Sequence, residues 1–337
     1  MKLELTAVDY LRPMDWGVTS PQLFRANDGC LYVAKLCGNK LGVKALANEA
    51  LAAILGEKLG LCFPPAGTIW LDRRLMEKNR RLRKAAHQHG PHFASRYLGH
   101  CRFVDRTQLH RAANRNQLAG VMLFDHLLHN VDRTHNRKNL LIRREDERNL
   151  VYAIDHSHLF GTGRWTADSL RKLAGDLSVN TRRVYGLLLK HYLAPDDFES
   201  HAVAVTALSD TDVSQAVGAI PADWLPDEND RLILTEHLIM RRNLVDEIVA
   251  RLTALIPADR RRKPHVTTKA ELLSPSSTDN TAATDPDTRG EEAGGRTYRC
   301  RPFHASYGPI PNRRVAVRES DLRNHRCGKI YPSRWFV

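Results

Sequence analysis

Residues 130–139 have the sequence NVDRTHNRKN and follow a long apolar segment. That preceding segment, residues 108–130, carries apolar residues at helical spacing, enough to bury one face. It predicts a long core helix that ends near Asn130. The polar stretch NVDRTHNRKN then forms a loop between this helix and the next element of the chain.

Two apolar runs come after this loop. The runs NLLI (139–142) and LVYAI (150–154) are joined by the highly charged RREDERN, a pattern typical of an antiparallel hairpin with a solvated turn. Asp155 directly follows the second run. The sequence therefore places Asp132 in a loop between helix and strand, and Asp155 at the end of a strand.

Two carboxylates on such supports suit phosphoryl transfer. That reaction needs a carboxylate to receive the hydroxyl proton and oxygen ligands that hold Mg²⁺ on the phosphates. We expect Asp132 to be the base or the substrate-orienting carboxylate, and Asn139 and Asp155 to ligate the metal through oxygen. Arg133 or His135 would brace the loop or the phosphates.

A lysine and a glutamate earlier in the chain fit the same chemistry. Lys35 ends the predicted strand LYVAK, and Glu49 lies inside the helix that follows. A lysine on a strand reaches the α- and β-phosphates as a point charge, and a glutamate on the next helix holds its ammonium in place. The plainer alternatives are that Lys35 and Glu49 are solvated surface residues, and that Asp132 and Asn130 only cap a helix end and a turn.

The first hundred residues predict short strands and one clear helix. Apolar spacing and the stop after Gly60 indicate a helix over 46–61. The turn signal Asn27-Asp28-Gly29 lies between two β-like runs and predicts a hairpin. GTIWL (67–71) and HFASRYLG (92–99) read as further strands, and the charged run 73–90 as a solvated helix or loop.

The rest of the chain divides by composition. Up to Pro257 it is mostly helical, and residues 232–256 predict one buried helix. Residues 258–296 shift to Ser, Thr, Asp, Pro and Gly, a composition that cannot offset chain entropy and predicts a disordered linker. Residues 297–337 form an Arg-rich tail with interleaved aromatic residues, for which no structure is predicted.

The charge balance limits the classes of partner. The net charge is +13, but the chain from Asp259 onward has 16 Lys/Arg against 9 Asp/Glu, so the body is only mildly basic. A duplex-binding surface usually concentrates its cations on one element of the fold, and this distribution weakens a nucleic-acid role for the main domain. Nucleic acid could then bind only through the basic tail, whose mixture of arginine and aromatic residues could bind RNA or an acidic partner. The plainer alternative is that the tail is a disordered polybasic end.

Cysteine usage and hydropathy bear on the compartment. The chain has 6 Cys without CxxC spacing, which favours reduced thiols and a cytoplasmic location. The N-terminal stretch has no apolar signal region, and no run approaches the roughly 20 apolar residues of a membrane span. We therefore expect a protein that is neither secreted nor integral to a membrane.

Four of these motifs together resemble the HipA-like kinase family. In order they are LYVAK, NEALAAILGEKLGLCFPP, FDHLLHNVDRTHNRKNLLI and YAIDHSHLF, and the similarity covers roughly residues 20 to 250. The resemblance implies an α+β, bilobal protein-kinase-like fold with ATP between a small mixed N-lobe and a larger, mostly helical C-lobe. On this basis the expected divisions are 1–100 for the N-lobe, 101–257 for the C-lobe, 258–296 for the linker and 297–337 for the tail.

The resemblance also implies roles for individual residues. Lys35 and Glu49 would be the ATP lysine and its helix partner, Asp132 the catalytic aspartate, and Asn139 and Asp155 the metal ligands. No GxGxxG motif is present, and Asn27 and Gly29 stand where a phosphate-covering loop belongs. These two residues are therefore included in the expected nucleotide site.

Two further departures from the protein-kinase pattern concern the metal site. Kinases commonly place the metal asparagine five residues after the catalytic aspartate, a position occupied here by Arg137. Asn136 and Asn139 flank it, and Asn139 is preferred because it continues into a strand. Asp155 is followed by His156-Ser157, not Phe-Gly, so activation logic based on that motif does not transfer.

The expected function is an ATP- and Mg²⁺-dependent kinase that phosphorylates a hydroxyl, with protein Ser/Thr as the acceptor the resemblance implies. A phosphoinositide-type lipid kinase is an alternative, because its loop is similar to DRxHxxxN. A nucleotide-binding pseudokinase or adaptor is another, which the shifted asparagine and the missing glycines favour. The acceptor and the oligomeric state are not indicated by the sequence.

Overall fold

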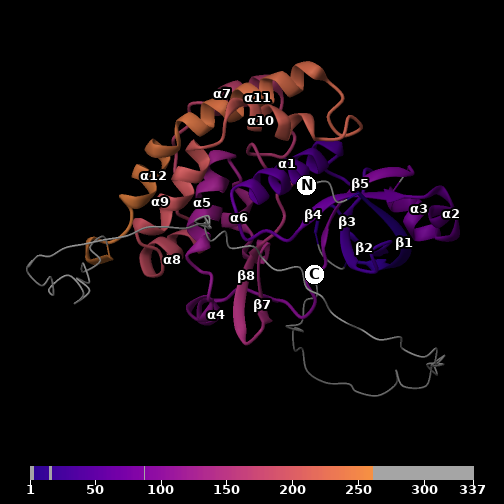
Figure 1. Cartoon of the computed structure of the whole chain (residues 1–337), viewed down its shortest axis with the longest axis horizontal. Helices are drawn as coiled ribbons and strands as arrows, with labels where there is room; N and C mark the ends of the chain where they lie inside the picture. Colours follow the sequence, from indigo (N-terminus) through magenta and orange to yellow (C-terminus); the bar gives the residue numbers. More distant parts are fainter. Residues whose placement is uncertain (1–3, 15–16, 87, 261–337) are drawn as a thin grey trace, which may run out of the picture. The chain divides into compact units, whose positions relative to one another are not determined.

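The computed structural model describes residues 4–14, 17–86 and 88–260 (Figure 1). All of these residues belong to one compact unit. The predicted tail 297–337 lies outside them, as does the predicted linker apart from its first residues, which form the 3-10 turn η2 (Ala258–Arg260).

The N-terminal strands close into a five-stranded barrel with the order β1-β2-β3-β5-β4. Side chains alternate between its interior and its outside, so that Tyr32 and Ala34 pack inward while Val33 and Lys35 lie on the other face of β3. The strands are β1 (Glu4–Pro13), β2 (Gln22–Ala26), β3 (Leu31–Lys35), β4 (Ala66–Leu71) and β5 (Gly90–Arg96).

The barrel confirms the predicted hairpin and adds a strand that the sequence patterns missed. β2 and β3 pair antiparallel around the turn at Asn27–Gly29. Strand β1 was not predicted, and it pairs antiparallel with β2 and parallel with β4, which closes the barrel. Register irregularities in β1 interrupt its pairing with β2, and such bulges weaken the strict alternation that marks a strand in sequence.

The predicted helix over 46–61 is confirmed as α1 (Val43–Lys58), displaced toward the N-terminus. It starts after Gly42, whose φ of 81° suits glycine, and ends before Gly60 at φ 63°. Its buried face packs against β4 and β5. The helix is thus fixed against the barrel, and this contact orients Glu49.

The charged run 73–90 folds as two short helices between β4 and β5. These are α2 (Arg73–Lys78) and α3 (Arg80–Ala86). Met76, Leu82 and Ala86 are buried and join the barrel's interior cluster. Leu75 and Ala85 also pack against this cluster, so a few apolar residues dock an otherwise charged segment.

The predicted hairpin after the polar loop is also confirmed. Strands β7 (Leu140–Glu145) and β8 (Arg148–Ala153) pair antiparallel, and β6 (Arg102–Phe103) extends them to a three-stranded sheet. Before the loop, the core helix expected to end near Asn130 is confirmed as α5 (Gln117–Leu127). It does not extend over all of 108–130, because a separate helix, α4 (Arg106–Arg111), precedes it and Asn114 between the two exchanges hydrogen bonds with the backbone of Val151 on β8.

The C-terminal region is helical, as predicted, but its last helix is interrupted. Leu244, at φ −96° and ψ 9°, leaves the helical range, so the segment expected as one helix forms α11 and α12. No helix within the described ranges is long and apolar enough to cross a membrane. The helices are α7 (Ala167–Leu173), α8 (Val184–His191), α9 (Asp196–Thr206), α10 (Asp210–Gly218), α11 (Glu228–Asn243) and α12 (Val245–Thr253).

Helix α5 forms the centre of the main core. All but one of its residues are buried, and it packs against α9 and α12. The polar loop begins where α5 ends, so its backbone starts from a fixed point. The predicted mixture of strands and helices is confirmed, while the division into two lobes remains a prediction.

Candidate active site

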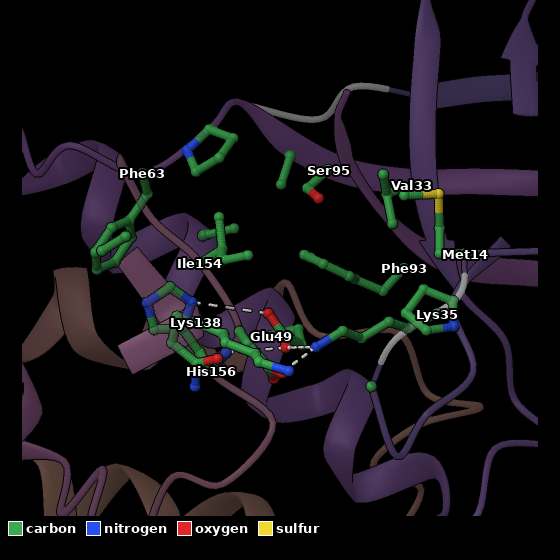
Figure 2. A pocket seen from close by; sticks show the side chains of 18 of the residues that line it. Met14, Val33, Lys35, Glu49, Phe63, Phe93, Ser95, Lys138, Ile154 and His156 are labelled. Carbon is green, nitrogen blue, oxygen red and sulfur yellow. Dashed lines mark hydrogen bonds and ion pairs between the residues drawn. The ribbon is translucent and has the colours of Figure 1, made fainter. Parts of the chain in front are cut away.

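A pocket of about 150 Å³ lies against the outer face of β3 and β5 (Figure 2). Its walls are mainly apolar, and its polar groups are concentrated around the end of β3. Residues from the barrel, α1, the polar loop and the segment after β8 all contribute. The lining residues are Met14, Gly17, Pro21, Val33, Lys35, Glu49, Ala53, Phe63, Pro64, Ala66, Phe93, Ser95, Phe103, Asn136, Lys138, Asn139, Ala153, Ile154, Asp155 and His156.

Lys35 joins two carboxylates that are far apart in sequence. Its ammonium forms an ion pair with Glu49 on α1 and another, 2.7 Å long, with Oδ1 of Asp155 (Figure 2). Burial by itself would lower the pKa of Lys35, but the carboxylates of Asp155 and Glu49 outweigh it and raise that pKa. Lys35 is therefore a fixed positive charge at the pocket, and the surface-residue alternative does not hold for it or for Glu49.

Asp155 is held in one orientation by three features. Its backbone has φ 62°, a region that Asp tolerates better than most residues. Its Oδ1 accepts hydrogen bonds from Lys35 and from the Ser157 hydroxyl, at 2.6 Å. Burial would raise the pKa of Asp155, but the Lys35 ammonium and these hydrogen bonds lower it, which keeps the carboxylate ionised.

Glu49 also fixes the backbone after Asp155. Its Oε1 accepts a 2.9 Å hydrogen bond from the amide of His156, and its Oε2 lies 3.7 Å from Nδ1 of that imidazole. Burial lowers the pKa of His156 and favours the neutral ring. The Glu49 carboxylate therefore fixes the position of both the Lys35 ammonium and the backbone that follows Asp155.

Asp132 begins the short helix α6 (Asp132–His135) and does not itself line the pocket. Its Oδ2 accepts a 2.7 Å hydrogen bond from Nδ2 of Asn139, which does line the pocket. The α6 N-terminus shows no side-chain cap, and Asn130 donates to Asp125. The side chain of Asp132 therefore bonds to Asn139 and does not cap its own helix.

Arg133 braces the loop from inside the core, where its side chain is fully buried. Its guanidinium forms an ion pair with Asp125 of α5, and it donates 2.8 Å hydrogen bonds to the carbonyls of Asn139 and Ile154. Burial would lower the pKa of Arg133, but Asp125 raises it. The sequence left open whether Arg133 braces the loop or the phosphates, and these buried contacts favour the loop.

Sequence reasoning did not single out Asp125, although an acidic residue within the apolar run of α5 was a signal. Its carboxylate receives hydrogen bonds from Arg133, Asn130 and the Tyr185 hydroxyl. Replacing Asp125 with alanine is expected to lower the free energy of unfolding by about 3 kcal/mol, because Arg133 would remain buried without a counter-charge. Urea unfolding measures this loss.

The matched control for this variant is Asp168→Ala on the exposed side of α7, which should change stability by less than about 0.5 kcal/mol. An Asp125→Ala protein as stable as the wild type would show that the buried pair is not needed to hold the loop.

His135 lies at the exposed end of α6. Its Nδ1 is 2.9 Å from the carbonyl of Val131, and its own carbonyl accepts from the Arg183 guanidinium. It does not line the pocket. His135, the other candidate brace, is therefore an exposed residue of the loop that does not reach the pocket.

Asn27 and Gly29 are not brought to the pocket. The side chain of Asn27 accepts a hydrogen bond from the backbone of Thr6, and both residues lie in the turn at the far end of the hairpin from Lys35. The five residues of β3 separate that turn from Lys35 by roughly 14 Å. Instead, Met14, Gly17 and Pro21, from the stretch between β1 and β2, lie at the Lys35 end and line the pocket.

Sequence reasoning missed this segment because it missed β1. Sequence reasoning also missed Lys138, a loop residue that lines the pocket and adds a second cation to Lys35 there. The signal for Lys138 was its place directly before Asn139. Figure 2 shows its side chain on the same side of the pocket as Glu49 and Lys35.

Comparison with known proteins identifies a family. The chain matches the model of the HipA-like kinase family over residues 7–253. No curated protein matches it. Similar solved structures include a Helicobacter pylori proinflammatory kinase, CtkA, with 11% identity, a TM-score of 0.47 and coverage of 76% of this chain and 100% of that one.

Two other solved structures are similar at comparable levels. The Golgi casein kinase with Mn/ADP bound has 12% identity, a TM-score of 0.43 and coverage of 78% of each chain. Hydra Fam20 with sugar has 10% identity, a TM-score of 0.44 and coverage of 74% and 87%. The family match spans most of the chain and confirms the resemblance seen in its motifs, and the chain belongs to the HipA-like kinase family.

Proposed function

We propose that this kinase transfers the γ-phosphate of ATP, with Mg²⁺, to a serine or threonine hydroxyl of a protein. The observation that carries the proposal is the position of Lys35, which pairs with both Glu49 and Asp155 at one pocket. Phosphoryl transfer in kinases uses a lysine on the phosphates that is held by a helix glutamate, together with an aspartate that ligates the metal.

The pocket's two kinds of wall suit the two ends of a nucleotide. Apolar residues such as Val33, Phe63 and Ile154 would contact the base, which gains from leaving water. Lys35 and Lys138 lie where the phosphates would extend, and each can act as a point charge on them. Met14, Gly17 and Pro21 line the pocket where no glycine-rich loop is present, and they are the candidate cover for the nucleotide.

The donor set at the pocket fits Mg²⁺, a hard ion that prefers oxygen ligands and usually takes one or two carboxylates. Asp155 is partly exposed, with a side-chain exposure of 25%, so its carboxylate is accessible from the pocket. The Nδ2 of Asn139 is engaged by Asp132, which leaves its amide oxygen as the atom that could ligate. When bound, the ion would neutralise charge on the phosphates.

Asp132 is proposed as the carboxylate that orients the acceptor hydroxyl and receives its proton. It is partly exposed and contacts Asn139, which lines the pocket, so it is accessible to a protein side chain next to the pocket. Asn139 fixes one carboxylate oxygen through its hydrogen bond. The ion pair between Arg133 and Asp125 keeps the loop that carries both residues in position.

The test is incubation of the purified chain with Mg²⁺ and γ-labelled ATP. Label should appear on the protein itself or on an added acceptor protein, on Ser or Thr when phosphopeptides are sequenced, and chelation with EDTA should abolish it. Binding of ATP without any transfer would support the pseudokinase alternative instead. Label on a phosphoinositide but on no protein would support the lipid-kinase alternative.

A further inference from the structure

The segment Asp72–Ala86, which contains α2 and α3, is termed here the basic insert. It holds seven Lys/Arg and two Asp/Glu, a net charge of +5. Residues 259–337 account for +7 of the chain's +13, so residues 1–258 carry +6. Residues 1–258 are only mildly basic as a whole, but nearly all of their excess positive charge is in this one short segment.

The cations of the basic insert face solvent. All seven are exposed, and Arg73 forms an ion pair with Glu77 on the same helix. Within the described part of the chain, the other six have no carboxylate at ion-pair distance. Those six are Arg74, Lys78, Arg80, Arg81, Arg83 and Lys84.

The fold does not need an insert of this length. Strands β4 and β5 pair antiparallel from Leu71 and Gly90 onward, and such a hairpin needs a loop of about two to five residues. The longer connection is instead anchored, because Met76, Leu82 and Ala86 are buried in the barrel interior. The basic insert lies beside β1 in Figure 1, and none of its residues lines the pocket.

The chemistry of this surface distinguishes between partners. The centre of a specific protein interface is depleted of charge and rich in apolar and aromatic residues, and a membrane-bound helix needs an apolar face. The insert's apolar side chains already contact the barrel, so its outer face offers neither. Five of its seven cations are arginines, whose planar guanidinium matches phosphate oxygens.

We propose that the basic insert binds the phosphate backbone of duplex DNA without reading its sequence. Anchored helices hold their cations at fixed spacing, which suits the regular phosphates of a duplex. Single strands are usually held by aromatic stacking platforms, and the insert has no aromatic residue. The kinase site would then act on acceptors near DNA, through a surface separate from its pocket.

The test uses the full chain and a fluorescein-labelled 20-base-pair duplex, with fluorescence anisotropy read at several salt concentrations. The variant is Arg74→Glu, Arg80→Glu and Arg81→Glu together. These positions lie in the first turns of α2 and α3, where the helix dipole favours an acidic residue, so the fold should be retained. We expect binding at least about tenfold weaker and a log–log salt slope smaller by about one to three.

The matched control reverses three exposed cations on other helices, Arg106→Glu, Lys190→Glu and Arg251→Glu, and it changes the net charge equally. It should retain most of the affinity, and a thermal melt should show that both variants are folded. Equal loss in both variants, or no loss in either, would overturn the proposal and leave the tail or net charge as the cause. So would absence of duplex binding, or tighter insert-dependent binding of a single-stranded RNA 20-mer or of polyglutamate.

Discussion

Asp132→Ala is expected to reduce the rate of phosphoryl transfer by about 10²- to 10⁴-fold, the usual contribution of a positioned general base. The nucleotide should still bind, because Lys35, Glu49 and Asp155 remain paired at the pocket and Asp132 does not line it. Transfer of label from γ-labelled ATP measures the loss. Isothermal titration with ATP and Mg²⁺ measures the affinity that should survive.

The control for Asp132→Ala is Asp168→Ala, which removes an exposed carboxylate that pairs with Arg171 on α7. It should transfer label at the wild-type rate. If Asp132→Ala does so too, Asp132 is not the proton-accepting carboxylate. A fall in ATP affinity as large as the fall in rate would place Asp132 in nucleotide binding instead.

Asp155→Asn is expected to reduce transfer by about 10³-fold or more, because loss of a metal ligand costs several kcal/mol of transition-state stabilisation. Asparagine keeps the shape of the side chain and tolerates the φ of 62° at this position. Lys35 retains its ion pair with Glu49, so the barrel and α1 should stay in place. A rate assay combined with titration of Mg²⁺ dependence measures the change.

The distinguishing result for Asp155→Asn is the metal requirement. A variant that needs much more Mg²⁺ for half-maximal transfer supports Asp155 as a ligand. A variant with a normal Mg²⁺ dependence would contradict that role, even if slow, and would leave Asp155 only as the partner of Lys35. Asp168→Ala again provides the comparison, since it changes an acidic residue remote from the pocket lining.

Local patterns predicted most elements of the fold. The turn at Asn27–Gly29, the helix near Glu49 and the hairpin after Asn139 were all evident from short-range spacing. The patterns failed where a distant contact overrides them. Asn114, between α4 and α5, bonds to β8, and α12, which follows the break at Leu244, packs against α5 and α9.

The candidate site was predictable in part. Lys35, Glu49 and Asp155 were chosen by residue type and order, and they converge in the structure. Asn27 and Gly29 were chosen by order alone, and they lie at the wrong end of the hairpin. Lys35 lies at the end of β3 that is opposite to the β2–β3 turn. The residues near Lys35 therefore come from the connection that precedes β2, which can be recognised only once β1 is known.

The sequence by itself determined which side chains are available and which helices and strands carry them, because turn chemistry and apolar spacing depend on near neighbours. Only the tertiary structure decided which charges meet. Lys35 and Asp155 are separated by 120 positions, and their 2.7 Å contact exists because barrel, α1 and the strand end before Asp155 pack together. Burial makes that pairing necessary, since an unpaired charge in a core is too costly to keep.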